Sequence, residues 1–290
     1  MVNKLSLQKI ISVAEVEYGK WICNWRMVIL LMLYVFIKTS TIDPLVSCAK
    51  QMKQPLNMME AVLAVGNSGL VLLILPIIYL TLMADFPCVD GNSFFVIHRI
   101  GRRNWMIGQL LFSVFSLLTY ITIVFLSVFL TTLPYSFVAN GWSLVVTDYE
   151  YYLPEGSGGV IASLLPANLY NQMPPNQAAV YTFLLLFLYL MILNGIMLLF
   201  RILRRKVMGF FLSGCMIVFG AALCAIHSKV MWLFPMAHSI VWLHYDSKFR
   251  ALECSLQTSV IYDLAIIFFM LMLCFLTIHR YNFDQIEVVD

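Results

Sequence analysis

Charged residues are scarce in this chain. Asp, Glu, Lys and Arg make up 11% of its 290 residues, whereas soluble domains contain about 25%. Hydrophobic residues make up 61%. This balance excludes a soluble globular domain and predicts an integral membrane protein. The net charge of +3 is small, so the placement of Lys and Arg between apolar segments is more informative than their excess, and we expect no nucleic-acid partner.

The sequence also lacks the motifs of ATPases and of membrane proteases. No Gly lies five positions before the single Gly-Lys pair, Gly19-Lys20, so there is no G-x-x-x-x-G-K-[ST] phosphate loop. No His precedes a Glu, no two Glu are adjacent and G-x-S-x-G is absent, which removes three protease patterns. His238 in "PMAHS" is the best single candidate for a serine intramembrane protease, against the alternative of a structural histidine that caps a broken hairpin.

The seven cysteines show neither C-x-x-C nor the spacing of a metal site, so we expect no metal to be bound. Most lie in or near apolar segments, where a free Cys acts as a small hydrophobe. Cys48 and Cys254 fall on the same side of the membrane in the topology below, and the sequence allows both a disulfide and two free thiols there. The cysteines are Cys23, Cys48, Cys88, Cys215, Cys224, Cys254 and Cys274.

Six apolar segments reach or approach the about 20 residues that a membrane-spanning helix needs. We therefore expect an all-α integral membrane protein in which residues 1–290 form a single transmembrane domain. The first segment is the weakest, because its apolar run meets Lys38 and ends at Asp43-Pro44. The second opens with "GNSG" and contains Pro76, which neighbouring helices can accommodate. The expected spans are residues 25–42, 61–84, 105–133, 178–199, 207–226 and 259–278.

Residues 1–24 predict an amphipathic helix that lies in the membrane interface. Apolar residues recur at steps of three and four with polar residues between them, and Trp21 and Trp25 suit headgroup depth. The mixture of charge and hydrophobes differs from the apolar core of a cleavable signal peptide, which we do not expect here. The apolar set is Leu7, Ile10, Ile11, Ala14, Tyr18, Trp21, Ile22 and Trp25.

Two further segments are not ordinary linkers. Residues 134–177 are rich in Gly, Pro, Asn and Tyr and form an outer loop too long for a plain hairpin. Residues 230–246, "VMWLFPMAHSIVWLHYD", are apolar, broken by Pro235 and too short to span. They predict a re-entrant or interfacial hairpin, in which Pro235 and His238 are candidates for an outer gate.

The distribution of Lys and Arg predicts the orientation. Twelve of the 18 lie in the N-terminal arm, the loop "HRIGRRNW", the turn after the fourth span and the tail, whereas residues 134–177 contain none. Cytoplasmic loops are enriched in Lys and Arg, so we expect both termini and this loop in the cytoplasm and the protein in the cell membrane. The basic turn "RILRRKVMG" is expected to contact anionic membrane lipid.

Polar residues inside the spans are candidates for lining a transport pathway. Each of them also fits an ordinary hydrogen bond between helices. Asp263 lies one turn inside the outer end of the sixth span, where it can reach headgroups or Lys229. The pathway candidates are Thr39, Ser40, Asn67, Ser68 and Asn194.

The order of these features resembles the membrane permease subunits of type-2 ATP-binding-cassette (ABC) transporters of the bacterial exporter type. The shared pattern is an amphipathic N-terminal helix, six spans with both ends inside, a basic loop after the second span and a broken hairpin before the sixth. The loop pattern R-x-G-R-R-x-W-x-x-G lies within "HRIGRRNWMIGQ", His98 to Gln109. As architecture the resemblance covers nearly the whole chain, and as sequence it is specific only around residues 94–109 and, less so, at "FPMAHS".

The resemblance implies that the loop after the second span forms a coupling helix, which docks on a separate ATPase subunit. That subunit would bind ATP and Mg, so this chain would bind no cofactor and catalyse no reaction itself. A second permease chain, identical or homologous, would complete the pathway, with the first, second and fifth spans lining it. The implied coupling residues are Phe94, Phe95, Ile97, His98, Arg99, Arg102 and Arg103.

The residues of this loop suit such a helix. Ser93 can cap its start and Gly101 can end it. The two phenylalanines and Ile97 supply apolar knobs for a pocket, and the arginines can pair with carboxylates or phosphates. Trp105 is expected at headgroup depth, and Gly108 permits a close helix approach.

The apolar to mildly polar spans suit an amphipathic cargo, such as a peptide, a lipid or a hydrophobic drug, better than an ion or a sugar. Two alternatives to a transporter stay open. One is a protease-like intramembrane enzyme, which the missing motifs disfavour. The other is a membrane sensor or assembly partner that transports nothing.

Overall fold

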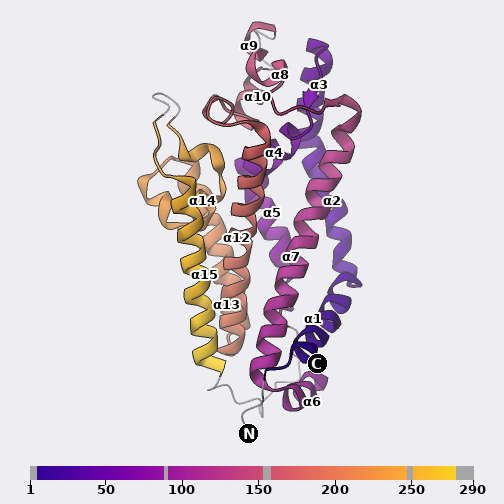
Figure 1. The fold of residues 1–290 in the computed structure, drawn as a ribbon, viewed down its shortest axis with the longest axis vertical. Coiled ribbons are helices and arrows are strands. Elements are labelled where there is room, and N and C mark those ends of the chain that lie inside the picture. The colour runs from indigo at the N-terminus through magenta and orange to yellow at the C-terminus, as the bar shows by residue number, and fades with distance from the viewer. Residues whose placement is uncertain (1–4, 88–90, 153–157, 247–250, 279–290) are drawn as a thin grey trace.

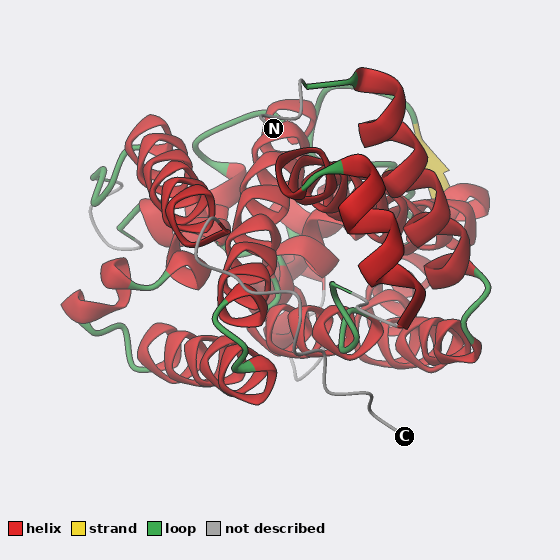
Figure 2. Ribbon diagram, turned by 90° about the horizontal axis from the view of Figure 1, so that it is seen from below, coloured by secondary structure: helices red, strands yellow, loops and turns green. Residues whose placement is uncertain are grey.

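The chain folds almost entirely into helices. The computed structural model describes residues 5–87, 91–152, 158–246 and 251–278. The long helices run alongside one another in an elongated bundle (Figure 1), and a view from below looks along several of them (Figure 2). One small sheet occurs in the described residues, where β1 (Leu56–Asn57) and β2 (Ser136–Phe137) pair in parallel. The expected all-α class is confirmed.

Among the described residues, five helices are long and apolar enough to cross a membrane. The bent pair α4 (Glu60–Asn67) and α5 (Gly69–Leu82) makes a sixth if it crosses as one span. The chain is therefore a multi-pass membrane protein. The five are Trp25–Met52, α7 (Arg102–Thr132) with η3 (Leu133–Tyr135), α12 (Pro175–Ile202), α13 (Lys206–Ala225) and α15 (Leu256–Ile278).

The two ends of the bundle differ. We call the end that carries α6 (Gly91–Ile100) the basal end and the opposite end, which carries α8 to α10, the apical end (Figure 1). α7 and α13 start at the basal end, and α12 and α15 finish there (Figure 1).

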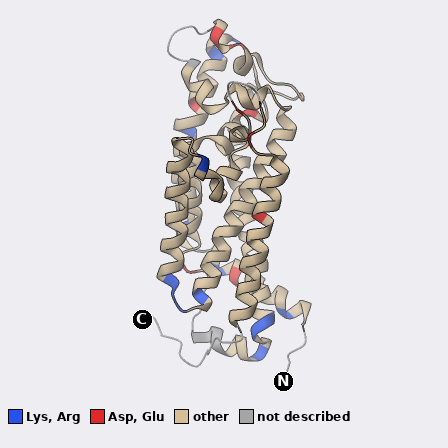
Figure 3. Cartoon of the chain, turned by 90° about the vertical axis from the view of Figure 1, so that its left-hand side faces the viewer, with Lys and Arg blue, Asp and Glu red and all other residues tan. Residues whose placement is uncertain are grey.

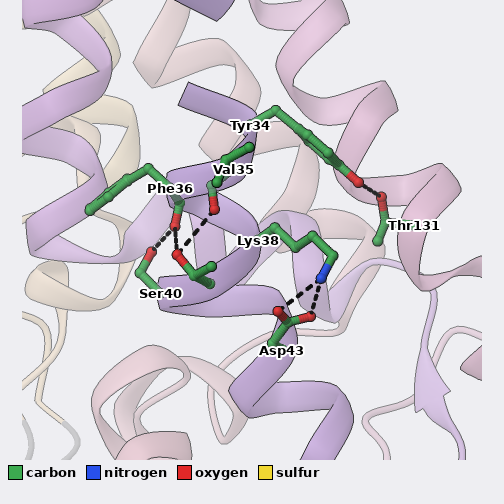
Figure 4. Close-up of polar contacts among 8 residues, drawn as sticks. Tyr34, Val35, Phe36, Lys38, Ser40, Asp43 and Thr131 are labelled. Atoms are coloured by element: carbon green, nitrogen blue, oxygen red, sulfur yellow. Dashed lines mark hydrogen bonds and ion pairs between the residues drawn. The ribbon is translucent and has the colours of Figure 1, made fainter. Parts of the chain in front are cut away.

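The helix of the first span continues past its predicted end at residue 42. It runs through η1 (Trp25–Val28), α2 (Ile29–Ile37), a π-helical turn η2 (Lys38–Ile42) and α3 (Asp43–Met52). Pro44 lies in the first turn of α3, and the wider π turn precedes it, so the missing N–H does not end the helix. The π turn also brings residues five apart onto one face of the helix. As a result, Lys38 Nζ lies 2.9 Å from both carboxylate oxygens of Asp43 (Figure 4).

The second span is bent by 75° between Asn67 and Gly69, not at Pro76. Ser68 has an extended backbone, with φ −72° and ψ 123°. Pro76 lies inside α5, which continues through it. The continuous helix expected over residues 61–84 is therefore two helices. Next to the bend, α4 packs very close to α12, since a Cβ added at Gly66 would overlap the Thr182 side chain of α12.

α12 is the most buried of the five candidate spans and packs against α4, α7, α13, α15 and α14 (Pro235–Ser239). Asn194 Nδ2 donates to the Tyr79 hydroxyl at 2.7 Å, which ties α12 to α5. The Tyr120 hydroxyl donates to the Leu75 carbonyl at 2.7 Å and ties α7 to α5. Buried polar groups thus hold the centre of the bundle together.

α1 (Leu7–Ile22) packs along the basal half of α7 (Figure 1). The Tyr18 hydroxyl lies 2.9 Å from Thr119 Oγ1. The predicted helix is present, but Trp21 is only 7% exposed, whereas Trp25 is 79% exposed. Trp21 therefore belongs to the contact with the bundle. The buried face comprises Ile10, Val13, Ala14, Glu17 and Trp21.

Short helices replace the long outer loop expected over residues 134–177. They are α8 (Leu144–Thr147), α9 (Tyr149–Tyr152), α10 (Gly158–Leu164) and α11 (Ala167–Tyr170). Glu60, at the start of α4, anchors them: its carboxylate accepts from Ser143 N at 2.6 Å, Ser143 Oγ at 2.8 Å and Asn57 N at 2.8 Å. The expected hairpin before the last span folds as η4 (Lys229–Leu233), α14 and η5 (Val241–His244), each too short to span.

Gly108→Ala should destabilise the protein. A Cβ at Gly108 would lie 2.7 Å from Val13 Cβ and 3.0 Å from the Ile10 carbonyl oxygen, so α1 must move away from α7. Overpacking of this kind costs about 1–3 kcal/mol and should lower the melting temperature in detergent micelles. The control is Gly19→Ala, where a Cβ meets nothing within 4 Å and should be neutral or stabilising. A Gly108→Ala protein as stable as wild type contradicts the close packing.

Candidate functional site

α6 is a short helix at the basal end (Figure 1), and it follows α5 and precedes α7 in the chain. It ends at Gly101, whose φ of 93° and ψ of 143° suit glycine alone. The Gly101 N–H donates to the Ile97 carbonyl at 2.8 Å, and α7 starts at Arg102. The prediction that Gly101 ends a helix here is confirmed. The side chain of Ser93, the expected cap, lies outside the described part.

Hydrogen bonds attach α6 to α1 and α7. Lys9 Nζ donates to the Arg99 carbonyl at 3.3 Å. The amide of Asn104 accepts from Ser6 N at 3.2 Å and donates to the Ile100 carbonyl at 2.9 Å. A force on α6 is therefore carried to two helices and not absorbed in a loose loop.

The side chains of α6 divide between solvent and core. Phe95 is 73% exposed, and His98 and Arg99 are also exposed. Ile97 is only 2% exposed and lies in the apolar core. Its expected role as an outward knob is wrong, because it anchors the helix instead. The Phe94 side chain lies outside the described part of the chain.

The start of α7 matches the sequence predictions in part. Arg102 and Arg103 are exposed, as an interface with carboxylates or phosphates requires. Gly108 makes the close helix approach that was expected, against α1. Trp105 is 3% exposed and packs in the core, and its expected place at headgroup depth stays a prediction.

Asp85 forms an ion cluster at the basal ends of three helices. Its Oδ2 lies 2.5 Å from Arg26 Nη1 at the start of the first span, and its Oδ1 lies 3.0 Å from Lys206 Nζ at the start of α13. Partial burial raises the pKa of the Asp85 carboxyl, but hydrogen bonds from Lys206 and Arg26 outweigh it and hold that pKa below its usual range. The charged carboxylate thus links the first, second and fifth spans. Nothing local in the sequence reveals the two cations that pair with Asp85.

Two of the five predicted pathway residues, Asn67 and Asn194, bond to neighbouring helices. Asn67 is fully buried and its Nδ2 donates to Leu63 O at 3.0 Å and Thr182 Oγ1 at 2.9 Å. Asn194 is buried against α5, and Ser68 lies at the bend of the second span. These contacts match the alternative of hydrogen bonds between helices.

Thr39 and Ser40 bond within their own helix. Their hydroxyls donate to the carbonyls of Val35 and Phe36, one turn earlier. Figure 4 shows Ser40 at the Phe36 carbonyl. The hydroxyls thus donate to backbone carbonyls next to the π turn, where the regular pattern of helical hydrogen bonds is interrupted.

The outer-gate candidates lie inside the apical hairpin. Pro235 and His238 are both buried in α14. His238 Nδ1 lies 2.7 Å from Ser259 Oγ, and His244 Nε2 lies 2.8 Å from the same oxygen. Burial lowers the pKa of both imidazoles, that of His244 to about 4, so both rings are neutral near pH 7.

The cluster around Ser259 was missed at the sequence level. Its members come from α14, from η5 and from α15, and no motif spacing connects them. Cys254 also belongs to it, with Sγ 3.7 Å from Ser259 Oγ. Cys254 and Cys48 are both free thiols.

Asp263 is fully buried in α15. Neither carboxylate oxygen has a hydrogen-bond partner among the described residues. It does not reach a headgroup-exposed position, and no ion pair joins it to Lys229 in the described part of the chain.

No protein-family model, no curated protein and no solved structure matches this chain. The family expected from the order of its features therefore stays a prediction.

Asp85→Asn should weaken the basal end in a pH-dependent way. Because the pKa of Asp85 is lowered in the folded state, the carboxylate adds stability above its unfolded pKa of about 3.9, and that stability is lost as pH falls through the folded pKa. At pH 7 we expect a loss of no more than about 1 kcal/mol, since the side chain is half exposed. The melting temperatures of variant and wild type should converge at low pH.

A matched control is Asp148→Asn, because Asp148 pairs with Thr147 and with no cation in the described residues. It should leave the melting curve unchanged at every pH. An Asp85→Asn protein that keeps its full stability at pH 7 and low salt would show that the ion cluster is not holding the helices.

Proposed function

We propose that this chain is the membrane permease subunit of a type-2 ABC exporter, which moves an amphipathic or hydrophobic cargo with ATP hydrolysed by a separate subunit. The proposal rests on α6, a short basal helix that is hydrogen-bonded to α1 and α7 and exposes an aromatic ring to solvent. A membrane protein that only anchors itself has no need of a connected, outward-facing helix at this place.

The geometry supports a coupling role for α6. Phe95 offers an aromatic anchor of the kind that dominates protein interfaces, and it is 73% exposed. Ile97 fixes the other face of the helix in the core, and Lys9 holds Arg99 from α1. When the ATPase subunits close on ATP, displacement of α6 would tilt α1 and α7 together.

The charges support a cytoplasmic basal end. Lys and Arg gather at the lower end of the bundle in Figure 3, around α6 and the start of α13. By the positive-inside rule this end faces the cytoplasm, where the ATPase and its ATP and Mg are available. The described residues nearest the two ends, Leu5 and Ile278, would then lie on the cytoplasmic side of the cell membrane, and Arg201 and Arg205 would contact anionic lipid.

The cargo class follows from a groove between α2 and α7. Its volume is about 350 Å³, within the range of sites for small molecules. Its walls are apolar except for a few hydroxyls, and a hydrogen bond of 2.9 Å joins Tyr34 and Thr131 across it (Figure 4). Such a surface suits an acyl chain or an apolar peptide side chain. A second permease chain, identical or homologous, would complete the pathway.

A serine intramembrane enzyme is the alternative with an observation in its favour, the Ser259–His238 hydrogen bond. Ser259 is fully buried, however, and aromatic rings surround it. A scissile peptide cannot reach its hydroxyl in this conformation. A sensor or assembly partner without transport remains the other alternative, and liposome assays separate it from a transporter.

Phe95→Asp should release the ATPase subunit. Loss of an interface anchor costs at least about 2 kcal/mol, which is about a 30-fold weaker complex. The measurement is co-purification of an ATPase with the tagged permease from native membranes, followed by cargo-stimulated ATP hydrolysis in liposomes. Wild type should retain a stoichiometric ATPase, and the variant should lose both the partner and the stimulation.

The matched control is Val138→Asp, an 80% exposed apolar residue near the apical end. It adds the same charge and should leave the complex intact. If Phe95→Asp keeps the ATPase and its coupling, α6 is not the coupling helix. Wild-type protein that purifies without any ATPase contradicts the proposal as a whole.

A further inference from the structure

Three potential metal ligands meet where the apical hairpin touches α15. They are His238 in α14, His244 in η5 and Cys254 just before α15, and their ligand atoms all lie within 4.8 Å of one another. Ligand atoms of a tetrahedral zinc site are about 3.4–3.6 Å apart, given the usual Zn–N and Zn–S distances. A shift of about 1 Å in flexible side chains is therefore enough to complete such a geometry.

Both imidazoles are already oriented as metal ligands. His238 Nε2 lies 2.9 Å from the Trp232 carbonyl oxygen, and His244 Nδ1 lies 3.0 Å from the Ile240 carbonyl oxygen. A carbonyl can only accept, so these two nitrogens carry the ring protons. The remaining nitrogens, which face Ser259, carry lone pairs. A second ring nitrogen that donates to a backbone carbonyl is the usual support of a metal-bound histidine.

The cluster contains too few protons for its hydrogen bonds. The Ser259 hydroxyl has one proton, yet its oxygen lies 2.7 Å from His238 Nδ1 and 2.8 Å from His244 Nε2. It can donate to one ring only, so the other contact sets a lone pair against a lone pair. An added proton on either ring is disfavoured by burial, because His238 is 3% exposed and His244 is not exposed at all. A cation that accepts both lone pairs removes the conflict.

The surroundings favour a cation and shield it from water. Trp232 lies 5.3 Å from the ring of His238 and 5.2 Å from that of His244, and Tyr262 stacks on His238 at 4.3 Å between ring centroids. Asp263 lies one helical turn after Ser259 on the same face of α15, buried and without a hydrogen-bond partner among the described residues. A positive ion bound nearby would stabilise the ionised form of this carboxyl.

We propose that His238, His244 and Cys254 bind one divalent zinc-type ion at the apical end of the protein. Two imidazoles and one thiolate select borderline-soft metals over Mg²⁺ or Ca²⁺. On binding, the Cys254 thiol loses its proton to solvent and the sulfur becomes the third ligand. The Ser259 hydroxyl, which contacts both ligand nitrogens, is not needed as a ligand. The ion would link the hairpin to the N-terminal end of α15. This role is independent of what the protein transports.

The test uses the purified full-length protein in detergent, stripped of metal with a chelator. Zn²⁺ is added back, excess is removed, and bound metal is measured by mass spectrometry. Co²⁺ is added in a parallel sample, where a tetrahedral site with a thiolate gives a sulfur-to-cobalt charge-transfer band. We expect about one ion per chain, the band in the Co²⁺ sample, and a higher melting temperature with Zn²⁺ because a ligand of the folded state stabilises it.

Cys254→Ser is the principal variant, since Cys254 is partly exposed and its change should not prevent folding. It should abolish the charge-transfer band and weaken Zn²⁺ binding at least about 100-fold, more than a supporting residue would. His238→Ala and His244→Ala should do the same. Cys215→Ser is the matched control, a partly exposed thiol on α13 outside the cluster, and it should change nothing.

Ser259→Ala separates a metal site from a purely hydrogen-bonded cluster. It removes the hydroxyl on which both rings depend and should still bind about one Zn²⁺ per chain. Wild-type protein without stoichiometric Zn²⁺, or Zn²⁺ binding that survives Cys254→Ser, overturns the proposal. So does a Ser259→Ala protein that loses the metal while Cys254→Ser keeps it.

Discussion

The bundle depends on hydrogen bonds that satisfy the backbone groups freed where the second span is broken. Backbone groups freed by a bend inside a membrane need partners within the protein, since no water replaces them. Asn67 supplies these partners. Its side chain bonds to Leu63 and Thr182 and accepts from Val241 N at 2.8 Å, while its own carbonyl accepts from Trp242 Nε1 at 3.0 Å. One asparagine thus joins the broken span to α12 and to the apical hairpin.

Different interactions hold the two ends of the molecule together. At the apical end, the buried carboxylate of Glu60 and the Asn67 contacts fix short helices over the bundle, so the closure there is made of directed hydrogen bonds. At the basal end, the links are an exposed ion cluster at Asp85 and the packing of α1 on α7. Exposed ion pairs are weak and exchange partners readily. A bundle that is fixed at one end and weakly tied at the other can open at the weak end, and the proposed transport function would use such an opening.

The sequence revealed those features that depend on local pattern. Hydropathy predicted the spans because the length of an apolar run can be read from consecutive residues. Gly101 was expected to end α6 because few other residues adopt the backbone conformation that ends a helix in this way. The bend at Ser68 was missed, since Pro76 is the stronger local signal and the contacts that hold the bend come from Thr182 and Val241, more than 100 residues away. Ile97 was expected to point outward because nothing local reveals that the bundle covers that side of α6. The cluster around Ser259 required three segments to be brought together in space.

The proposed contact between α6 and an ATPase subunit can be tested in the membrane itself. The most direct measurement is photo-cross-linking from a benzoyl-phenylalanine placed at Phe95 in intact cell membranes, with the adducts identified by mass spectrometry. The account predicts an adduct with an ATP-binding protein, and predicts that the yield changes when a non-hydrolysable ATP analogue is added to permeabilised membranes. Adducts with lipid alone, or the same adducts with and without nucleotide, would contradict it.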